Sequence, residues 1–239
     1  MAESQLSHRI SVVVPTLNEA DNIAPLIEQI AAAAPDYAEI VIVDDGSDDG
    51  TPERVRELAE RCRVNLIQRD KPALGLAGAV IAGARAAHGE IVVVMDADLS
   101  HPPDQIPNLV QPLREGRADM VIGSRYVRGG TTPGWPLARK IMSRLAAAAA
   151  YPLTGVHDSM CGFFAIRRNR LLELAPKATG FKIAFEAIAR GHGSLRILEI
   201  PIAFRDRARG VSKMTLRIAT LFAMRWLAVL SRRVFRHRR

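Results

Sequence analysis

One stretch of this chain indicates both its fold and the position of its functional site: Ile91-Val92-Val93-Val94-Met95-Asp96-Ala97-Asp98. Its apolar half is rich in β-branched residues, which is typical of a strand buried on both faces. Two carboxylates follow at the carboxyl end of that strand, where they could share one hard cation such as Mg²⁺ or Mn²⁺. The same pair also suits a solvated turn, so its meaning depends on the sequence around it.

The pattern of an apolar run followed by polar residues recurs along the first half of the chain. Short β-branched runs at residues 10–15, 40–43, 64–68 and 120–122 predict further strands. The first helix is expected after Asn18 and Asp21, which are placed to cap it. Three further helices are expected: one that begins at Thr51, one over residues 74–87 and one over residues 104–114. This alternation predicts an α/β fold with a Rossmann-like, mostly parallel sheet flanked by helices.

Four of these strands deliver polar residues at their carboxyl ends. The clusters are Asn18-Glu19, Asp44-Asp45, Asp96-Ala97-Asp98 and Ser124-Arg125. Ligands of open α/β sheets bind at this edge, so we expect the clusters to line one site. A carboxylate after the second strand could bind a nucleobase or ribose, although a tight turn would need the same residues. A calcium loop from Asp45 is excluded, because Arg56 stands where a Glu is required.

The sequence lacks the motifs of several other classes of functional site. Gly75, Gly78 and Gly83 form neither the dinucleotide-binding nor the P-loop pattern, which argues against NAD and P-loop chemistry. No Ser-His-Asp or Cys-His arrangement is evident, and His101, before two prolines, is more typical of a structural residue. Two distant cysteines, Cys62 and Cys161, fit no metal-ligand spacing and favour free thiols in a reducing compartment.

The alternation loosens after residue 125. A loop is expected over residues 129–135, an Ala-rich helix over residues 137–151 and a compact Gly-Phe-Phe segment within residues 158–167. Residues 171–174 and 183–190 are expected to be helical, residues 195–204 to form one strand or two, and residues 214–234 a long apolar helix. No linker that would separate two globular domains is evident. We therefore expect a single catalytic domain over residues 1–216, followed by a basic helix or tail over residues 217–239.

The positive charge is concentrated at the C-terminus. The whole chain has a formal net charge of +8, whereas residues 205–239 hold ten Arg and one Lys against a single Asp. Arg217 and Arg225 interrupt the apolar run of this segment, and a central Arg costs roughly 2.5–3.5 kcal/mol on insertion scales. We therefore expect an interfacial helix on an anionic membrane surface, with packing on the domain or on a second copy as the alternative. Few aromatic residues accompany these cations, so a nucleic-acid partner is not expected.

The N-terminus carries no apolar signal segment. We therefore expect a cytoplasmic protein, peripheral on the cytoplasmic face of a membrane. A small membrane-protein partner or a homo-oligomer would be compatible with this placement.

Motifs along residues 10–216 resemble a known family. Residues 13–19 and 43–47 are similar to the start of inverting glycosyltransferases of the GT-A fold, which belong to family 2. The resemblance is narrowed to the dolichol-phosphate mannose synthase-like branch by residues 95–103, 123–126 with Gly129-Gly130, 158–163, and 204–207 with Gly210, Ser212 and Lys213.

The resemblance implies roles for individual residues. Pro15, Leu17 and Glu19 would line the nucleotide pocket, with Val43 and Asp45 beside the base or ribose. Asp96, Ala97 and Asp98 would meet a Mg²⁺ or Mn²⁺ ion and the diphosphate, with Ser100 at a further metal position that is often Gln. Arg125, Arg207 and Lys213 would contact the donor phosphates, Arg139 and Ser143 the acceptor phosphate, and Glu186 the transferred sugar. Asp98, Arg125, Arg139 and Glu186 are the catalytic candidates. Leu17 stands where a Tyr is common.

The implied reaction transfers a hexose, first of all mannose from GDP-mannose, to a polyprenyl or dolichyl monophosphate with inversion. The second pKa of a phosphate monoester is near ~6, so this nucleophile is already largely ionised and needs little help from a general base. A UDP-sugar such as UDP-glucose with the same acceptor is the alternative reaction. A non-catalytic sugar-nucleotide binding protein is a more remote one.

Overall fold

The computed structural model describes residues 9–206 except Asp36, Ala38, Lys71, residues 177–181 and His192. The expected helix over residues 214–234, the division at residue 217 and the basic tail lie outside the described residues. Within them, no helix is both long enough and apolar enough to cross a bilayer.

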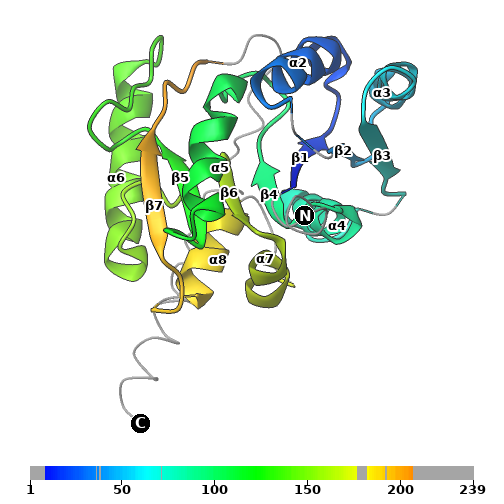
Figure 1. Cartoon of the computed structure of the whole chain (residues 1–239). Coiled ribbons are helices and arrows are strands. Elements are labelled where there is room, and N and C mark those ends of the chain that lie inside the picture. The colour runs from blue at the N-terminus through cyan, green and yellow to red at the C-terminus, as the bar shows by residue number, and fades with distance from the viewer. Residues whose placement is uncertain are drawn as a thin grey trace.

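A mixed sheet of seven strands organises the described residues, in the order β3-β2-β1-β4-β6-β5-β7 (Figure 1). Strands β1 to β4 run parallel to one another, and β7 runs parallel to β5. Strand β6 lies antiparallel between β4 and β5. The strands are β1 (Ile10–Thr16), β2 (Glu39–Asp44), β3 (Val64–Gln68), β4 (Ile91–Val94), β5 (Met120–Ser124), β6 (Phe164–Arg167) and β7 (Ile197–Pro201). The predicted mostly parallel α/β sheet is confirmed.

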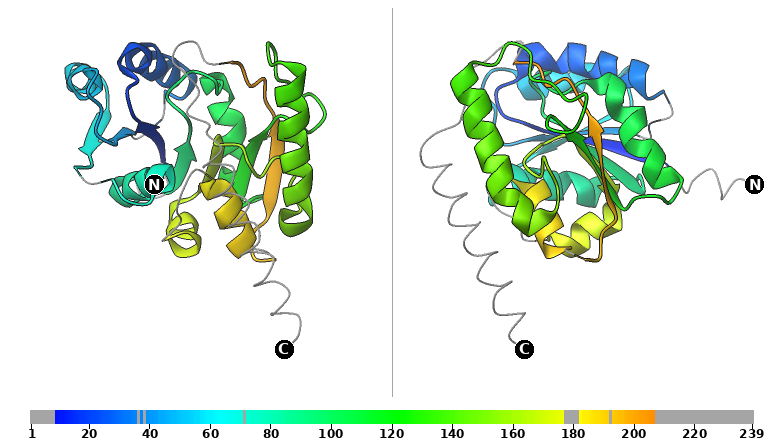
Figure 2. Two further views of the ribbon diagram at one scale, coloured as in Figure 1. Left: turned by 180° about the vertical axis from the view of Figure 1, so that it is seen from behind. Right: turned by 90° about the vertical axis from the view of Figure 1, so that its left-hand side faces the viewer.

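Helices cover both faces of this sheet. Helices α2 and α3 lie on one face and α4 and α7 on the other, while α6 runs along the outer side of β7 (Figures 1 and 2). The helices are α2 (Ala20–Ala33), α3 (Thr51–Ala59), α4 (Gly75–Ala86), the short 3-10 helix η1 (Pro103–Gln105), α5 (Ile106–Arg114), α6 (Leu137–Thr154), α7 (Arg168–Leu174) and α8 (Ile183–Arg190).

The core consists of the strand residues and the helix faces that cover them. All residues of β1, β2 and β4 are buried, as expected for strands that have helices on both sides. Helix α4 approaches the sheet closely at Gly83, where an added Cβ would come within 2.5 Å of the Cγ1 atom of Val13. The absence of a side chain at Gly83 therefore allows this close approach of α4 to the sheet.

Three local predictions differ from the structure. The N-cap of α2 is Glu19, and Asp21 lies within the first turn of the helix. The Asn18 side chain accepts a hydrogen bond from the backbone N–H of Asp48. The capping roles expected for Asn18 and Asp21 are therefore wrong. Residues 164–167 form a strand inside the segment expected only to be compact. Helix α6 continues through Pro152 to Thr154, and Gly155 ends it in the left-handed conformation with φ of 68°.

Candidate active site

The four predicted polar clusters follow β1, β2, β4 and β5, whose carboxyl ends share one edge of the sheet. Strand β4 pairs in parallel with β1, and β1 with β2. Strand β5 has the same direction because β6 runs antiparallel to both β4 and β5. Two predicted pocket residues, Pro15 and Val43, are register partners on neighbouring strands, and both are buried. The sheet therefore brings together residues that are far apart in the sequence.

Asp44, the last residue of β2, uses its carboxylate to hold the turn that follows. Its side chain is fully buried and accepts hydrogen bonds from the backbone N–H groups of Gly46 and Ser47 at 3.1 and 3.0 Å. The hydroxyl groups of Thr16 and Ser47 also donate to it. Asp44 thus ties the ends of β1 and β2 together, as an Asx-type turn does.

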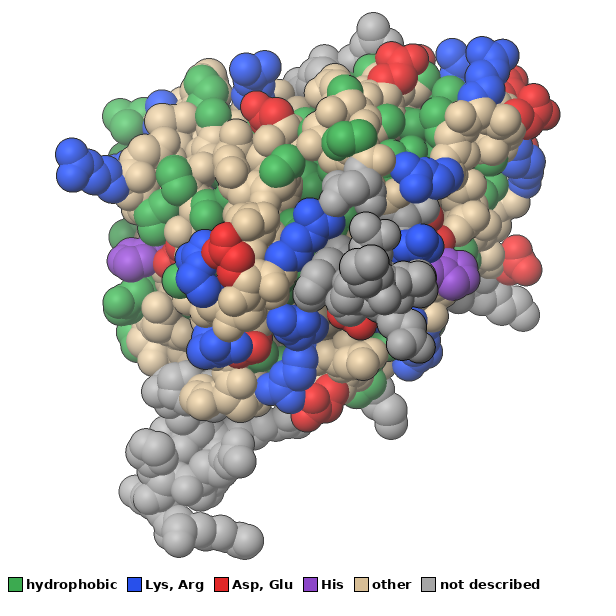
Figure 3. Space-filling model, viewed as in Figure 1, with side chains coloured by type: hydrophobic (Ala, Val, Ile, Leu, Met, Phe, Trp, Pro, Cys, Tyr) green, Lys and Arg blue, Asp and Glu red, His purple; other side chains and the backbone are tan. Residues whose placement is uncertain are grey.

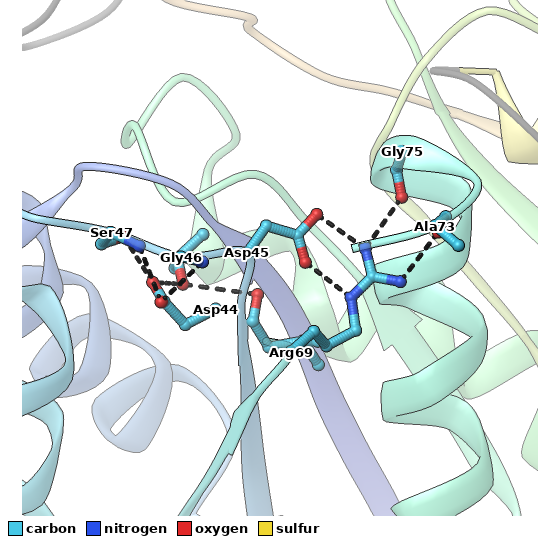
Figure 4. Close-up of polar contacts among 9 residues, drawn as sticks. Asp44, Asp45, Gly46, Ser47, Arg69, Ala73 and Gly75 are labelled. Atoms are coloured by element: carbon cyan, nitrogen blue, oxygen red, sulfur yellow. Dashed lines mark hydrogen bonds and ion pairs between the residues drawn. The ribbon is translucent and has the colours of Figure 1, made fainter. Parts of the chain in front are cut away.

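Asp45 has a different partner, Arg69, which follows β3 (Figure 4). The Arg69 Nε and Nη2 atoms donate to the two Asp45 carboxylate oxygens at 2.6 and 2.7 Å. Arg69 also donates to the carbonyl oxygens of Ala73 and Gly75, at 3.0 and 3.2 Å, and so fixes the loop before α4. This two-pronged pair presets the orientation of the carboxylate that is predicted to meet the base or ribose. Arg69 was not among the predicted site residues, and its only signal in the sequence is its position directly after a strand.

The loop after β1 carries Leu17 and Glu19. The Leu17 side chain is partly exposed, which is compatible with a surface that a nucleotide covers. The Glu19 carboxylate accepts a hydrogen bond from the Asn22 side chain at 2.7 Å, and its backbone N–H donates to the Thr51 hydroxyl. This loop is thereby attached to the start of α3.

The motif Asp96-Ala97-Asp98 follows β4 with its two carboxylates in different environments. The Asp96 side chain is 36% exposed, whereas Asp98 is buried and accepts a hydrogen bond from the Ser100 backbone N–H at 3.1 Å. Ala97 is buried and packs in the core. Leu99 adopts the left-handed conformation with φ of 60°, which turns the chain sharply at this point.

The buried ring of His101 contacts Asp96 of this motif. Its Nδ1 atom accepts a hydrogen bond from the Asp96 backbone N–H at 3.0 Å, and its Nε2 atom lies 3.8 Å from Asp96 Oδ2. Complete burial lowers the pKa of His101 despite the opposing charges of Asp96 and Asp98, which favours the neutral ring. Because Nδ1 accepts a hydrogen bond, the proton of the neutral ring lies on Nε2. The ring stacks on Phe163 at a centroid distance of 5.2 Å. These contacts agree with the structural role expected for His101.

The donor set of this motif suits a small hard cation. The described residues contain no group of three or more His, Cys, Asp and Glu side chains placed to hold a metal ion. Mg²⁺ and Mn²⁺ are commonly held by one or two carboxylates, with substrate phosphates completing the shell, and Asp96 and Asp98 supply two. Within the part of the chain that the structure describes, the Ser100 hydroxyl is a buried oxygen without a hydrogen-bond partner. The chemistry of these three oxygen-bearing side chains suits a metal position, and their role as metal ligands stays a prediction.

Arg125, at the end of β5, is held in a buried ion pair. Its Nε and Nη2 atoms each donate to Asp158 at 2.7 Å, and its backbone N–H donates to the same carboxylate at 2.9 Å. The Arg125 side chain is 9% exposed and Asp158 is fully buried. Burial lowers the pKa of Arg125, but the hydrogen bonds and charge of Asp158 outweigh it, and the net shift is upward. The predicted contact of Arg125 with donor phosphates stays a prediction, because the guanidinium here faces Asp158.

Arg139 and Ser143 lie on α6, one turn apart. Arg139 donates to Asp206 at 2.9 Å, and its guanidinium carbon lies 3.8 Å from the centroid of the Trp135 ring. The Tyr126 hydroxyl donates to Ser143 at 2.5 Å. Both partners of the Arg139–Asp206 pair are substantially exposed, so this pair is weak and a phosphate could replace Asp206.

Glu186 and Lys182 belong to the start of α8. Glu186 is buried and accepts a hydrogen bond from Arg190 at 2.9 Å. The Lys182 amine donates to the Met160 carbonyl oxygen at 3.1 Å. Loss of solvation lowers the pKa of Lys182, and the nearby charge of Arg125 lowers it further, against the raising effect of Asp96. Lys182 therefore lies near Arg125 and Asp96, although its sequence position did not predict it as a site residue. Arg207 and Lys213 lie outside the described residues.

Comparison with known proteins identifies the family. The family model described as glycosyl transferase family 2 matches residues 11–175, more than half of the chain. The chain belongs to glycosyl transferase family 2. The region of this chain that the family model matches includes the polar residues at all four strand ends, among them both aspartates of the Asp96-Ala97-Asp98 motif.

The chain is similar to proteins and solved structures whose activities are known by name. The chain is 41% identical over 212 residues to the dolichol-phosphate mannosyltransferase of Pyrococcus furiosus, covering 86% of this chain but only 59% of that protein. It is 37% identical over 223 residues to the dolichol-phosphate mannosyltransferase of Saccharomyces cerevisiae, covering 88% and 82%. A structure of glucosyl-3-phosphoglycerate synthase from Mycobacterium tuberculosis, in complex with Mg²⁺ and uridine diphosphate, superposes with a TM-score of 0.71 at 24% identity, covering 95% and 80%. The last likeness concerns the fold alone.

Proposed function

We propose that this protein transfers mannose from GDP-mannose to a polyprenyl or dolichyl monophosphate, with inversion at the anomeric carbon. The observation that carries the proposal is the placement of the Asp96-Ala97-Asp98 motif at the same sheet edge as the Asp45–Arg69 pair, in a chain similar over most of its length to dolichol-phosphate mannosyltransferases. A nucleotide bound at β1 and β2 would extend its diphosphate toward β4.

The donor would lie across the carboxyl ends of β1, β2 and β4. Asp45, preset by Arg69, would accept hydrogen bonds from the base or ribose. The walls of this pocket would be Pro15, Leu17, Glu19 and Val43, and Ala97 would face the diphosphate. The partly exposed Asp96 and the buried Asp98 would hold a Mg²⁺ or Mn²⁺ ion, with Ser100 at its third protein position. The ion would neutralise the charge of the leaving diphosphate.

The acceptor phosphate would bind at α6. Arg139 would exchange its exposed Asp206 partner for a phosphate oxygen, and Ser143 would donate a hydrogen bond to the same group. One acceptor oxygen then attacks the anomeric carbon of mannose from the face opposite to the diphosphate. The bond from that carbon to the β-phosphate oxygen breaks, so the products are a β-linked mannosyl lipid phosphate and GDP. The acceptor is already largely dianionic at neutral pH, and no base in the protein is required.

Further cations and one buried acid complete the proposal. Arg125, Arg207 and Lys213 would screen the phosphates, which matters because donor and acceptor are both anions. Glu186, held by Arg190, would accept hydrogen bonds from sugar hydroxyl groups. The basic segment over residues 217–239 would rest on the membrane at its cytoplasmic face, where the lipid acceptor is available.

A donor panel tests the proposed function. Radiolabelled GDP-mannose and UDP-glucose are each incubated with the full chain, a polyprenyl phosphate in vesicles and Mg²⁺ or Mn²⁺. We expect label from GDP-mannose in the chloroform-soluble fraction. Label from UDP-glucose alone would assign a different donor to the same site. No lipid-soluble product from either nucleotide sugar would refute the transferase.

A further inference from the structure

A carboxylate from strand β7 anchors the loop that follows helix α6. Glu199 of β7 pairs in register with Ile122 of β5, and its side chain is 12% exposed. One carboxylate oxygen accepts a hydrogen bond from the backbone N–H of Asp158 at 3.0 Å, and the other accepts one from the backbone N–H of His157 at 2.9 Å. The second oxygen also lies 2.8 Å from the Nδ1 atom of the His157 ring. Glu199 therefore holds two successive backbone groups with one side chain.

The loop that Glu199 anchors holds Arg125 in turn. Asp158, whose backbone Glu199 fixes, accepts three hydrogen bonds from Arg125 at 2.7 to 2.9 Å. The Arg125 guanidinium carbon also lies 5.2 to 5.5 Å from the centroids of three aromatic rings, those of Tyr126, Trp135 and Phe204. Because both members of the Arg125–Asp158 pair are buried, the position of the guanidinium follows that of the Asp158 carboxylate.

The same loop, over residues 157–162, contacts the metal motif and a second cation. An added Cβ at Gly162 would come within 3.3 Å of Asp96 Oδ1, so the backbone at this point lies against that carboxylate. The Met160 carbonyl oxygen accepts a hydrogen bond from the Lys182 amine at 3.1 Å. A displacement of this loop would therefore move the partners of Arg125 and Lys182 together.

The geometry at Glu199 requires a carboxylate. Its two oxygens each accept a hydrogen bond from one of two successive N–H groups, whereas an amide has only one acceptor oxygen. With Gln at this position, the NH2 group would face one of the N–H groups and leave that donor unpaired. The loop would then shift, and the Asp158 carboxylate and the Arg125 guanidinium would shift with it.

We propose that Glu199 is a positioning residue: it fixes the backbone of His157 and Asp158, and through Asp158 it fixes the Arg125 guanidinium, without touching the substrate. The use of Arg125 in catalysis rests on the proposed function, in which this cation screens the phosphates of donor and acceptor. A displacement of about 1 Å in such a site can lower a rate roughly 100-fold. Glu199 therefore controls sugar transfer from outside the pocket.

Glu199→Gln in the full chain tests this role, because it keeps the size of the side chain and removes one acceptor. We expect kcat/KM for mannosyl transfer from GDP-mannose to fall roughly 10–100-fold. Circular dichroism and urea denaturation show whether the variant is folded under the assay conditions. A residue that only stabilises the fold would lower the urea midpoint and leave kcat/KM of the folded variant unchanged.

Two variants serve as controls. Asp119→Asn breaks a similar anchor before β5, because Asp119 accepts hydrogen bonds from the backbone N–H and the side chain of Arg196. Acidic and basic side chains lie next to one another on the face of the molecule drawn in Figure 3, and exposed pairs of this kind contribute little. His157→Ala removes the ring contact and keeps both backbone hydrogen bonds to Glu199. Both controls should transfer sugar like the wild type.

Tryptophan fluorescence reports the position of Arg125 independently of catalysis. The chain contains two tryptophans, so Trp226→Phe leaves Trp135 as the only emitter. The Trp135 ring is buried, and its centroid lies 5.5 Å from the Arg125 guanidinium carbon. In this background we expect Glu199→Gln to shift the Trp135 emission and to increase its quenching by acrylamide. Asp119→Asn should leave both unchanged.

A double variant tests the route through Asp158. If Glu199 acts only by placing the Asp158 carboxylate, its effect disappears once that carboxylate has been replaced. Glu199→Gln combined with Asp158→Asn should therefore transfer sugar no more slowly than Asp158→Asn alone.

Three outcomes would overturn the proposal. One is wild-type transfer by folded Glu199→Gln with unchanged Trp135 emission. Another is an equal loss of transfer in His157→Ala, which would assign the effect to the His157 ring. The third is a full additional loss when Glu199→Gln is added to Asp158→Asn. A wild-type chain that transfers no sugar would instead refute the proposed function, and a shifted Trp135 emission in Glu199→Gln would still support the placement of Arg125 by Glu199.

Discussion

The buried pair of Arg125 and Asp158 allows a sharp prediction about stability. Asp158→Asn keeps the size of the side chain but removes its charge, so the Arg125 guanidinium is left buried without a counter-charge. The amide also places a donor where the carboxylate accepted one of the 2.7 Å hydrogen bonds. Breaking one partner of a buried pair costs about 3–5 kcal/mol, a large fraction of the 5–15 kcal/mol that stabilises a typical domain.

Urea denaturation measures this loss. With an m value of roughly 3 kcal/mol/M, the midpoint should fall by about 1–2 M, with m itself unchanged. The matched control is Asp119→Asn, which breaks a similar two-pronged pair with Arg196 whose side chain is largely exposed. The midpoint of this control should move by only a small part of that amount.

A second substitution separates the charge from the packing. Arg125→Met in the Asp158→Asn background removes the unpaired charge, and it should restore part of the lost stability. The reasoning would be refuted by a midpoint for Asp158→Asn that moves no more than that of Asp119→Asn. A double variant less stable than Asp158→Asn alone would also contradict it.

Two further predictions concern Glu39 and Arg139. Burial raises the pKa of Glu39, but hydrogen bonds from His88 and Ser11 lower it more, so its folded value lies below the unfolded 4.5. Its stabilising effect is complete above pH 4.5 and disappears as the pH falls through the folded value, so denaturation midpoints of wild type and Glu39→Gln should differ at pH 7 and converge in acid. Arg139→Gln should raise the KM for a short-chain, water-soluble prenyl phosphate by roughly 10–100-fold and leave the donor KM unchanged, whereas Arg144→Gln should alter neither. A constant difference from pH 7 to 3, or equal acceptor KM values for the two Arg variants, would contradict these predictions.

The sequence predicted the main sheet because its strands are strongly apolar. Runs such as residues 91–94 leave few alternatives to a buried strand, and the polar residues after them had to lie at one edge. Strand β6 was not predicted, because Phe164 and its neighbours are defined as a strand only by pairing with β4 and β5, far away in sequence. Long-range pairing leaves no local signal of this kind.

The types of residue in the site were predicted from the sequence, but the ion pairs between them and other residues of the chain were not. Asp45 and Arg125 were expected to face ligand, yet each is engaged by an ion-pair partner, Arg69 or Asp158. These pairs depend on how separate loops meet above the sheet, which spacing along the chain does not encode.

The central claim is that Asp98 makes sugar transfer from GDP-mannose to a lipid phosphate depend on a divalent metal ion. The most direct measurement compares wild type, Asp98→Asn and the exposed control Asp104→Asn in the vesicle assay, with Mn²⁺ or with a chelator. We predict chloroform-soluble labelled product from wild type and Asp104→Asn with Mn²⁺ only, and at least a hundredfold less from Asp98→Asn, since about 3 kcal/mol of charge stabilisation is lost. Undiminished, metal-independent transfer by Asp98→Asn would contradict the account.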